Sequence, residues 1–307
     1  MVNLFKYIKE SILDDEDMVF NDDGIKHEIE KFIEDNYKCS RFTISSEPNK
    51  DGKFVVGGGN IQVTNKNITS LTNNLFIWGK VNGFFGCSEC KSLISLEGAP
   101  EKVGGSFDCS RCNSLTSLEG APGEVRGAFY CSRCDSLTSL EGAPEKVNGD
   151  FNCFYCDSLK SLEGAPEKVG GYFDCSHCDS LKTLEGAPEE IDGRFSCNSC
   201  DSLISLEGAP EKVNGRFDCS YCHSLETLEG APEKMNESFF CSYCHSLTSL
   251  EGAPKEVGGS FFCSCCKSLT SLNGAPEKIG GDFICIGNKF SIKDIKKVVK
   301  AKHIKIW

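Results

Sequence analysis

The chain lacks the sequence features of membrane, secreted and nucleic-acid-binding proteins. None of its 307 residues lies in an apolar run long enough for a transmembrane helix. Residues 1–8, Met-Val-Asn-Leu-Phe-Lys-Tyr-Ile, do not have the apolar stretch and small-residue cleavage site of a secretory signal. The formal net charge is −12, whereas a general nucleic-acid binder needs a basic surface. We therefore expect a cytoplasmic location, with no membrane and no nucleic-acid partner.

The common catalytic motifs are absent as well. The chain contains no G-x-x-x-x-G-K-[ST], no G-x-S-x-G and no H-E-x-x-H. Its histidines are scattered, at His27, His177, His223, His245 and His303. We expect no enzymatic activity and no cofactor.

What the chain does have is a strict repeat. Ten phenylalanines recur at 22-residue intervals from Phe85 to Phe283, and a cysteine follows each one two residues later, from Cys87 to Cys285. A fixed period of this length is typical of a solenoid, in which one coil cannot bury its own apolar side and several coils stack to form a continuous core. The sequence therefore predicts a repeat solenoid.

The repeat unit is clear in residues 106–127, S-F-D-C-S-R-C-N-S-L-T-S-L-E-G-A-P-G-E-V-R-G. Phe107 and Cys109 alternate with Asp108 and Ser110, which predicts a strand over 107–110 with its Phe and Cys facing inward. The other interior positions are those of Leu115, Leu118 and Val125. Nine of the ten prolines occupy one repeat position, which therefore belongs neither to a helix interior nor to a central strand.

Four segments follow from these patterns. Residues 1–37 form an acidic segment with two predicted amphipathic helices, and residues 38–80 form an α+β cap with a degenerate first coil. Residues 81–288 are the repeat array. Residues 289–307 form a basic cap, in which a helix over 291–301 would cover the last coil with Ile292, Ile295, Val298 and Val299.

The repeats resemble those of a known family. Phe107-x-Cys109-x-x-Cys112-x-x-Leu115 is similar to the leucine-rich repeat pattern L-x-L-x-x-(N/C)-x-L, and Phe283-Ile-Cys285-Ile-Gly-Asn288 resembles its asparagine form. The repeat sequence S-L-E-G-A-P-E-K-V-G-G resembles repeats encoded by large tailed bacteriophages. The resemblance implies a right-handed, leucine-rich-repeat-like solenoid with a parallel sheet on its concave side and a mostly extended or turn-like convex side. It also implies a host-cytoplasmic or virion-associated location.

The cysteines allow three interpretations. Nine C-x-x-C pairs have the spacing of four-cysteine zinc sites, but nine pairs do not divide evenly into such sites, and Asn288 stands where a tenth pair needs a thiolate. Disulfides remain open, although the total of 21 is odd and no secretion signal is present. We favour a structural ladder of buried thiols and expect no bound metal. Its positions are those of Cys109, Cys112, Cys131, Cys134, Cys153, Cys156 and Asn288.

Variation among the repeats is concentrated in three columns, which lie three before, one before and two after the first cysteine. These columns would line the exposed side of the sheet, the usual binding face of a horseshoe solenoid. They are rich in Tyr, Phe and Arg, the residues enriched at binding hot spots. The candidate protein-binding residues are Tyr130, Phe154, Tyr155, Tyr172, Arg194, Arg216, Tyr221, Phe240, Tyr243, Phe262 and Ile284.

We therefore expect a non-enzymatic scaffold that binds another protein through its concave sheet. One alternative is a phage structural or virion-associated component that docks by its N-terminal helices and uses the solenoid as a spacer. A second alternative is a thiol-rich metal-binding protein. The identity of the partner and the oligomeric state are open at this point.

Overall fold

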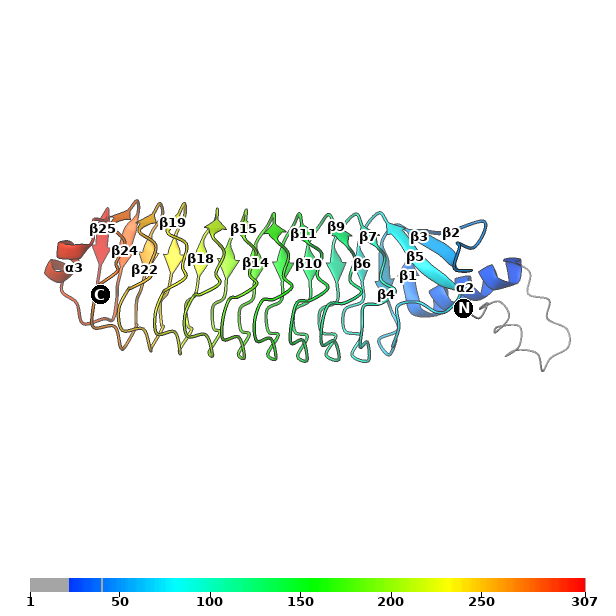
Figure 1. The fold of residues 1–307 in the computed structure, drawn as a ribbon, viewed down its shortest axis with the longest axis horizontal. Coiled ribbons are helices and arrows are strands. Elements are labelled where there is room, and N and C mark those ends of the chain that lie inside the picture. The colour runs from blue at the N-terminus through cyan, green and yellow to red at the C-terminus, as the bar shows by residue number, and fades with distance from the viewer. Residues whose placement is uncertain (1–21, 40, 307) are drawn as a thin grey trace.

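The computed structural model describes residues 22–39 and 41–306. Within them the chain forms a β-solenoid of parallel strands with a helix at each end, which confirms the predicted repeat solenoid. The coils follow one another along a nearly straight line, and the two caps lie at opposite ends (Figure 1). The predicted first helix, near residues 4–13, lies outside the described residues.

Each coil contributes one short strand to a 13-stranded sheet, called the Phe sheet below. Its inner strands run in chain order and pair in parallel, with phenylalanine against phenylalanine from coil to coil. In spatial order the strands are β1 (Tyr37–Cys39), β4 (Ile61–Val63), β6 (Phe85–Gly86), β8 (Phe107–Asp108), β10 (Phe129–Tyr130), β12 (Phe151–Asn152), β14 (Phe173–Asp174), β16 (Phe195–Ser196), β18 (Phe217–Asp218), β20 (Phe239–Phe240), β22 (Phe261–Phe262), β24 (Asp282–Ile284) and β25 (His303–Lys305).

A second strand in each coil forms another ladder, called the Val sheet. Its exposed residue is Lys or Glu and its buried residue is Val, Ile or Met in the repeat array. Nine strands form one part, in the order β17 (Lys212–Val213), β15 (Glu190–Ile191), β13 (Lys168–Val169), β11 (Lys146–Val147), β9 (Glu124–Val125), β7 (Lys102–Val103), β5 (Phe76–Val81), β3 (Phe54–Gly58) and β2 (Phe42–Ile44). The other part is β19 (Lys234–Met235), β21 (Glu256–Val257) and β23 (Lys278–Ile279).

The core is a set of columns that run through the array. The phenylalanine rings stack from coil to coil with centroids 4.9 to 5.7 Å apart, from Phe85 to Phe283. Both cysteines and both leucines of each repeat are buried, as are the Val-sheet side chains. A fully buried Leu, Val or Phe contributes roughly 1.5–3 kcal/mol, so each added coil extends a continuous apolar core.

Turns connect the two ladders. The leucine before each Glu-Gly turn donates its N–H to a backbone carbonyl of the next coil, as in Leu118 N to Glu141 O (2.8 Å) and Leu250 N to Asn273 O (2.9 Å). In the same turn, the N–H of Ala121 reaches back to the carbonyl of Leu118 (3.0 Å). The rest of the coil is therefore extended or turn-like, without helix, as predicted.

The N-terminal cap begins with the helix α2 (Asp22–Asn36), which buries Ile29 and Ile33. It continues into β1, which pairs antiparallel with β4, while β2 pairs antiparallel with β3. The side chains of Tyr37 and Trp78 both donate hydrogen bonds to the carbonyl of Leu71 (2.6 and 2.9 Å). This end of the core is therefore closed by a helix, two hairpin-like pairings and an aromatic cluster.

The C-terminal cap contains the helix α3 (Ile292–Val298), which Ser291 and Asp294 start with a capping box. Ile295 and Val299 are buried, but Ile292 and Val298 are 43% and 48% exposed. The expectation that all four residues cover the last coil is therefore wrong for two of them. The reason is length, because a helix of seven residues presents only a narrow stripe to the core.

Candidate binding surface

The three variable columns form one surface on the outer side of the Phe sheet, called the variable face below. The strand residue that follows the buried phenylalanine is Tyr130 in β10, Phe240 in β20, Phe262 in β22 and Ile284 in β24, and all four are half-buried. Tyr221 and Tyr243 are 45% and 37% exposed. None of the candidate residues belongs to the buried core.

The column two after the first cysteine has an unusual backbone. Its nine residues from Glu89 to Cys265 have φ between 56° and 64°, and Gly287 occupies the same column with φ 74°. This left-handed conformation is strained for side chains branched at Cβ, and the column contains no Val, Ile or Thr. The backbone therefore limits which residues vary there and points them out in one row.

One aromatic cluster lies toward the C-terminal end of the variable face. The rings of Phe240 and Phe262 stack in parallel with centroids 4.3 Å apart, and those of Tyr221 and Tyr243 stack at 4.5 Å. The guanidinium of Arg216 lies 5.8 Å from the centre of the Phe240 ring. Ile284 pairs in register with Phe262 and extends the apolar row.

A second cluster lies in the middle of the face. Phe154 contacts Tyr155 edge-on (5.3 Å), Tyr155 stacks on His177 (4.3 Å), and the guanidinium of Arg133 lies 4.6 Å from the centre of the Tyr155 ring. Arg133 and His177 were not among the predicted residues. Both lie in the same variable column as Tyr155, so the signal that identifies them was present in the sequence.

Tyr130 and Tyr172 do not join this cluster. Tyr172 lies under the guanidinium of Arg194, which is 4.6 Å from its ring centre. Burial and the nearby Asp150 carboxylate raise the pKa of both tyrosines. Phe154 and Tyr155 are therefore in ring contact, whereas Tyr130 and Tyr172 lie outside their cluster.

A shallow groove of about 470 Å³, lined in part by Tyr172, lies in the middle of the array. Its charged and aromatic lining consists of Asp150, Tyr172, Asp192, Arg194, Arg216 and Glu237. The Nε atom of Arg194 is buried there without a hydrogen-bond partner. The acidic lining residues were missed by the sequence analysis, because the groove joins adjacent columns from four coils.

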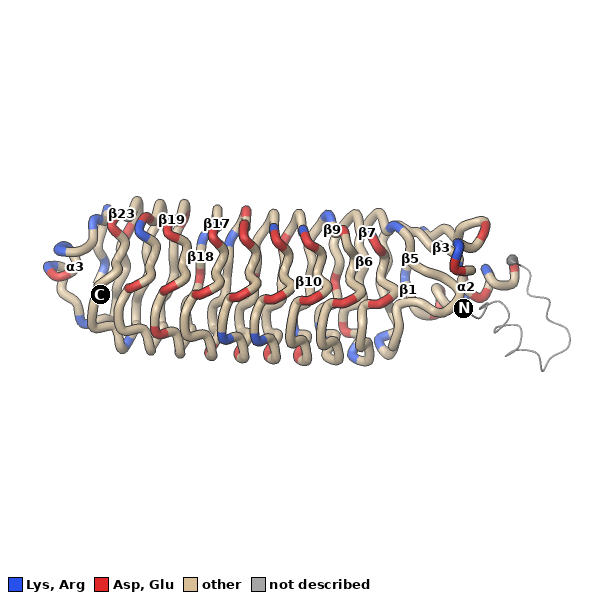
Figure 2. The backbone as a smooth tube through the Cα atoms, in the orientation of Figure 1, with Lys and Arg blue, Asp and Glu red and all other residues tan. Residues whose placement is uncertain are grey.

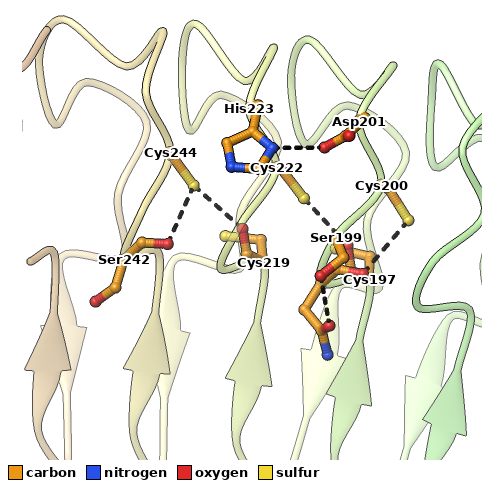
Figure 3. A network of polar contacts seen from close by, with 10 residues as sticks. Cys197, Ser199, Cys200, Asp201, Cys219, Cys222, His223, Ser242 and Cys244 are labelled. Atoms are coloured by element: carbon orange, nitrogen blue, oxygen red, sulfur yellow. Dashed lines mark hydrogen bonds and ion pairs between the residues drawn. The ribbon is translucent and has the colours of Figure 1, made fainter. Parts of the chain in front are cut away.

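The cysteines form a hydrogen-bonded ladder inside the coils (Figure 3). The second cysteine of a repeat donates its S–H to the carbonyl of the first cysteine of the preceding repeat, as in Cys200 to Cys175 (3.3 Å) and Cys222 to Cys197 (3.2 Å). The same bond recurs for Cys112, Cys134, Cys156, Cys178, Cys244 and Cys266. Asn288 takes over the role at the last coil, where its Nδ2 donates to the carbonyl of Cys263 (2.7 Å).

Burial raises the pKa of most thiols in the ladder, which favours their protonated form. All 21 cysteines are free, and all but Cys39 and Cys265 are buried. Burial raises the pKa of Cys156 to about 12 and that of Cys90 to about 11. At Cys285 hydrogen bonds from the Cys263 thiol and the Asn288 amide lower the pKa instead. Across residues 22–39 and 41–306, no three His, Cys, Asp or Glu side chains are arranged to hold a metal ion.

The outer side of the Val sheet is organised as internal charge pairs. Its exposed column carries glutamate in every third coil, at Glu124, Glu190 and Glu256, with a lysine in each adjacent coil. Lys168 and Lys212 both pair with Glu190, and these lysines lower its pKa to about 2. Figure 2 shows acidic and basic residues interspersed along the array. This surface is therefore satisfied within the chain, whereas the aromatic rows of the variable face present free ring faces and edges.

No helix among the described residues is long and apolar enough to span a membrane. Comparisons with protein-family models, with curated proteins and with solved structures give no match for this chain.

Proposed function

We propose that the chain is a non-enzymatic protein-binding scaffold whose partner docks on the variable face. The observation that carries the proposal is the stacked row of Phe240 and Phe262 beside Tyr221 and Tyr243, which lies outside the core. Phe240 and Phe262 are half-buried and Tyr221 and Tyr243 are exposed, so the four rings offer partly accessible apolar surface to a partner. Apolar surface patches often mark interaction sites, and Tyr and Arg are enriched where binding energy concentrates. The buried positions change little from repeat to repeat, whereas the variable columns differ, as expected for a scaffold that presents different side chains on one framework.

We also propose that the array is a leucine-rich repeat variant in which Phe and Cys replace the strand leucines. The equivalence of Asn288 and the second cysteines supports this, because both donate to the same carbonyl position. The repeat sequence S-L-E-G-A-P-E-K-V-G-G supports an origin in a large tailed bacteriophage and a location in the host cytoplasm or the virion.

Site-specific photo-crosslinking tests the binding face. A photo-reactive phenylalanine analogue replaces Phe262 in one protein and Ile204 in a matched control. Ile204 is 54% exposed but belongs to none of the three variable columns. We expect a partner adduct from host lysate at position 262 and none at 204. Equal adducts at both positions would contradict the proposal.

The purified partner is then titrated against substituted chains. Phe240→Ser and Phe262→Ser should each weaken binding by about 2 kcal/mol, about thirtyfold, as for hot-spot residues. The control pair Ile94→Ser and Ile204→Ser also removes exposed apolar groups and should leave the affinity unchanged. If neither Phe substitution matters and removal of residues 1–21 abolishes binding, the partner docks on the N-terminal segment instead.

A further inference from the structure

The C-terminal cap, residues 289–306, carries an unusual combination of exposed apolar and basic side chains. Large exposed hydrophobic side chains are few in the described part of the chain: Ile94, Ile204, Tyr221, Tyr243, Ile292 and Val298. Two of these six lie on the seven residues of α3. Ile94 and Ile204 are single exposed residues in two separate coils, whereas α3 carries two within seven residues.

The charge of this cap is strongly positive. Residues 289–307 contain seven lysines and one acidic residue, Asp294. Within the described part of the chain only Lys297 and Lys305 of these lysines form ion pairs, with Asp294 (3.2 Å) and Asp282 (2.7 Å). Figure 2 shows the basic residues gathered around α3 at this end of the array. The cap therefore fits a partner that offers apolar side chains next to carboxylates.

The strand β25 adds an open sheet edge beside the same surface. It is the last strand of the Phe sheet and pairs only with β24. Its outer backbone groups have no strand partner within the described residues, and such an edge is a template for another chain.

The sequence itself contains a segment with the complementary chemistry. Leu4, Phe5, Ile8, Ile12 and Leu13 recur at helical spacing and are followed by Asp14-Asp15-Glu16-Asp17. Residues 1–36 carry eleven acidic and four basic side chains in total. An apolar stripe followed by an acidic run matches Ile292 and Val298 next to unpaired lysines.

Covalent geometry excludes this contact within a single chain. The 13 strands of the Phe sheet place β25 about 60 Å from β1, at about 4.8 Å per strand. Residues 18–21, which join the acidic run to α2, span at most about 15 Å when fully extended. α2 contacts β1, and its first residues point away from the array (Figure 1). The occupant of the cap therefore has to come from a second molecule.

We propose that the chain associates head to tail, with residues 4–17 of one copy bound on the α3 surface of the next. This contact joins two different surfaces, and for straight arrays it does not close into a ring, so it generates open chains. The inference does not depend on the proposed function of the variable face.

Two sets of substitutions in the full-length chain test this. The first set removes the acidic run with Asp14→Asn, Asp15→Asn, Glu16→Gln and Asp17→Asn. The second removes the apolar pair and nearby charge with Ile292→Ser, Val298→Ser, Lys293→Gln and Lys296→Gln. Sedimentation velocity should show concentration-dependent chains for the unaltered protein and monomers for each variant. Thermal melts confirm that the variants are folded, and Ile94→Ser with Ile204→Ser is the matched control that should still associate.

Mixing the two variants gives the sharpest result. Each retains the surface that the other lacks, so an equimolar mixture should form a 1:1 complex and stop there. Raising the salt from about 0.05 M to about 0.5 M should weaken association about tenfold or more, because charges meet at the contact. A monomer at all concentrations, or a mixture that stays monomeric, would overturn the proposal. Binding of the monomeric protein to vesicles rich in anionic lipid through the same residues would assign the cap to a membrane surface instead.

Discussion

At the scale of single residues, one glycine column is fixed by geometry. Gly186 has φ +84°, and a Cβ on it would lie 2.5 Å from the backbone N and Cα of Glu163 in the preceding coil. Both its conformation and its surroundings exclude a side chain. By contrast Gly123 has no positive φ, and a Cβ there would meet its nearest atom, the carbonyl oxygen of Glu101, at 3.9 Å.

These two glycines make a direct comparison. Gly186→Ala should lower the free energy of unfolding by more than the 1–2 kcal/mol, roughly, that a left-handed residue costs, because the clash adds to it. Gly123→Ala should change it by about 0.5 kcal/mol or less. Thermal and denaturant unfolding of the two variants measures the difference. Equal effects would show that the coils do not stack as closely as described.

At the scale of the element, the sequence predicted the Phe strand but overestimated its length. Residues 107–110 were expected to be extended, whereas β8 covers only Phe107–Asp108. The bonds between coils continue beyond it, from Cys109 N to Tyr130 O (2.8 Å) and from Arg111 N to Ser132 O (2.8 Å). The left-handed turn at Arg111 ends the strand. This repeat position carries Arg, Tyr, His or Ser in other coils, and these residue types do not indicate a positive φ.

The Val strand was not predicted because it is too short to show a period. Lys102–Val103 offers one exposed and one buried residue, and alternation needs at least four residues to be recognised. The inward position of its Val was predicted from apolarity alone. Among candidate binding residues, the exposed columns could be predicted from where the repeats vary. Which aromatic side chains contact one another depends on rotamers and on the left-handed turn. The sequence therefore could not predict that Tyr130 and Tyr172 lie outside the cluster of Phe154.

The two cysteine columns make stability sensitive to alkaline pH. A buried thiol stays protonated in the folded chain, with a pKa of about 12 at Cys156, but loses its proton from about its ordinary value of 9.0 when unfolded. Because the pKa is higher in the folded chain, the protonated thiol contributes fully to the free energy of unfolding below about pH 9. That contribution is lost as the pH rises from about 9 toward the folded pKa. In this range each such thiol lowers the free energy of unfolding by up to about 1.4 kcal/mol per pH unit.

We therefore expect the unfolding temperature to be constant up to about pH 8.5 and to fall steeply above about pH 9. Cys156→Ala removes one of these thiols, so the unfolding temperature of the variant should fall less steeply above about pH 9. The variant should also be less stable at neutral pH. Leu159→Ala, which removes buried volume from the same coil but no titrating group, should leave the slope unchanged. An unfolding temperature that does not change between about pH 8 and about pH 11 would be incompatible with buried, protonated thiols.

At the scale of the whole molecule, interior and exterior have separate roles. Stacked Phe, Cys, Leu and Val columns stabilise the array through contacts between neighbouring coils, and the repeat therefore preserves them from coil to coil. The outer columns of the Phe sheet are free of that constraint and carry the aromatic clusters. The caps differ in charge, and the straight axis in Figure 1 places them at opposite ends. The proposed partner site on the aromatic clusters and the proposed contact between copies therefore use different residues.

The central claim is that the regularly spaced thiols are core packing, and counting reactive thiols in the native protein tests it most directly. After exchange into metal-free buffer without reductant, a thiol-specific chromophoric reagent should label Cys265 first. Cys39 should follow more slowly, because burial raises its pKa to about 11 and the reagent reacts with the thiolate. The remaining cysteines of the 21 should react only when denaturant unfolds the chain. Rapid reaction of most thiols in the folded protein, or zinc released in proportion to the thiols labelled, would contradict the account.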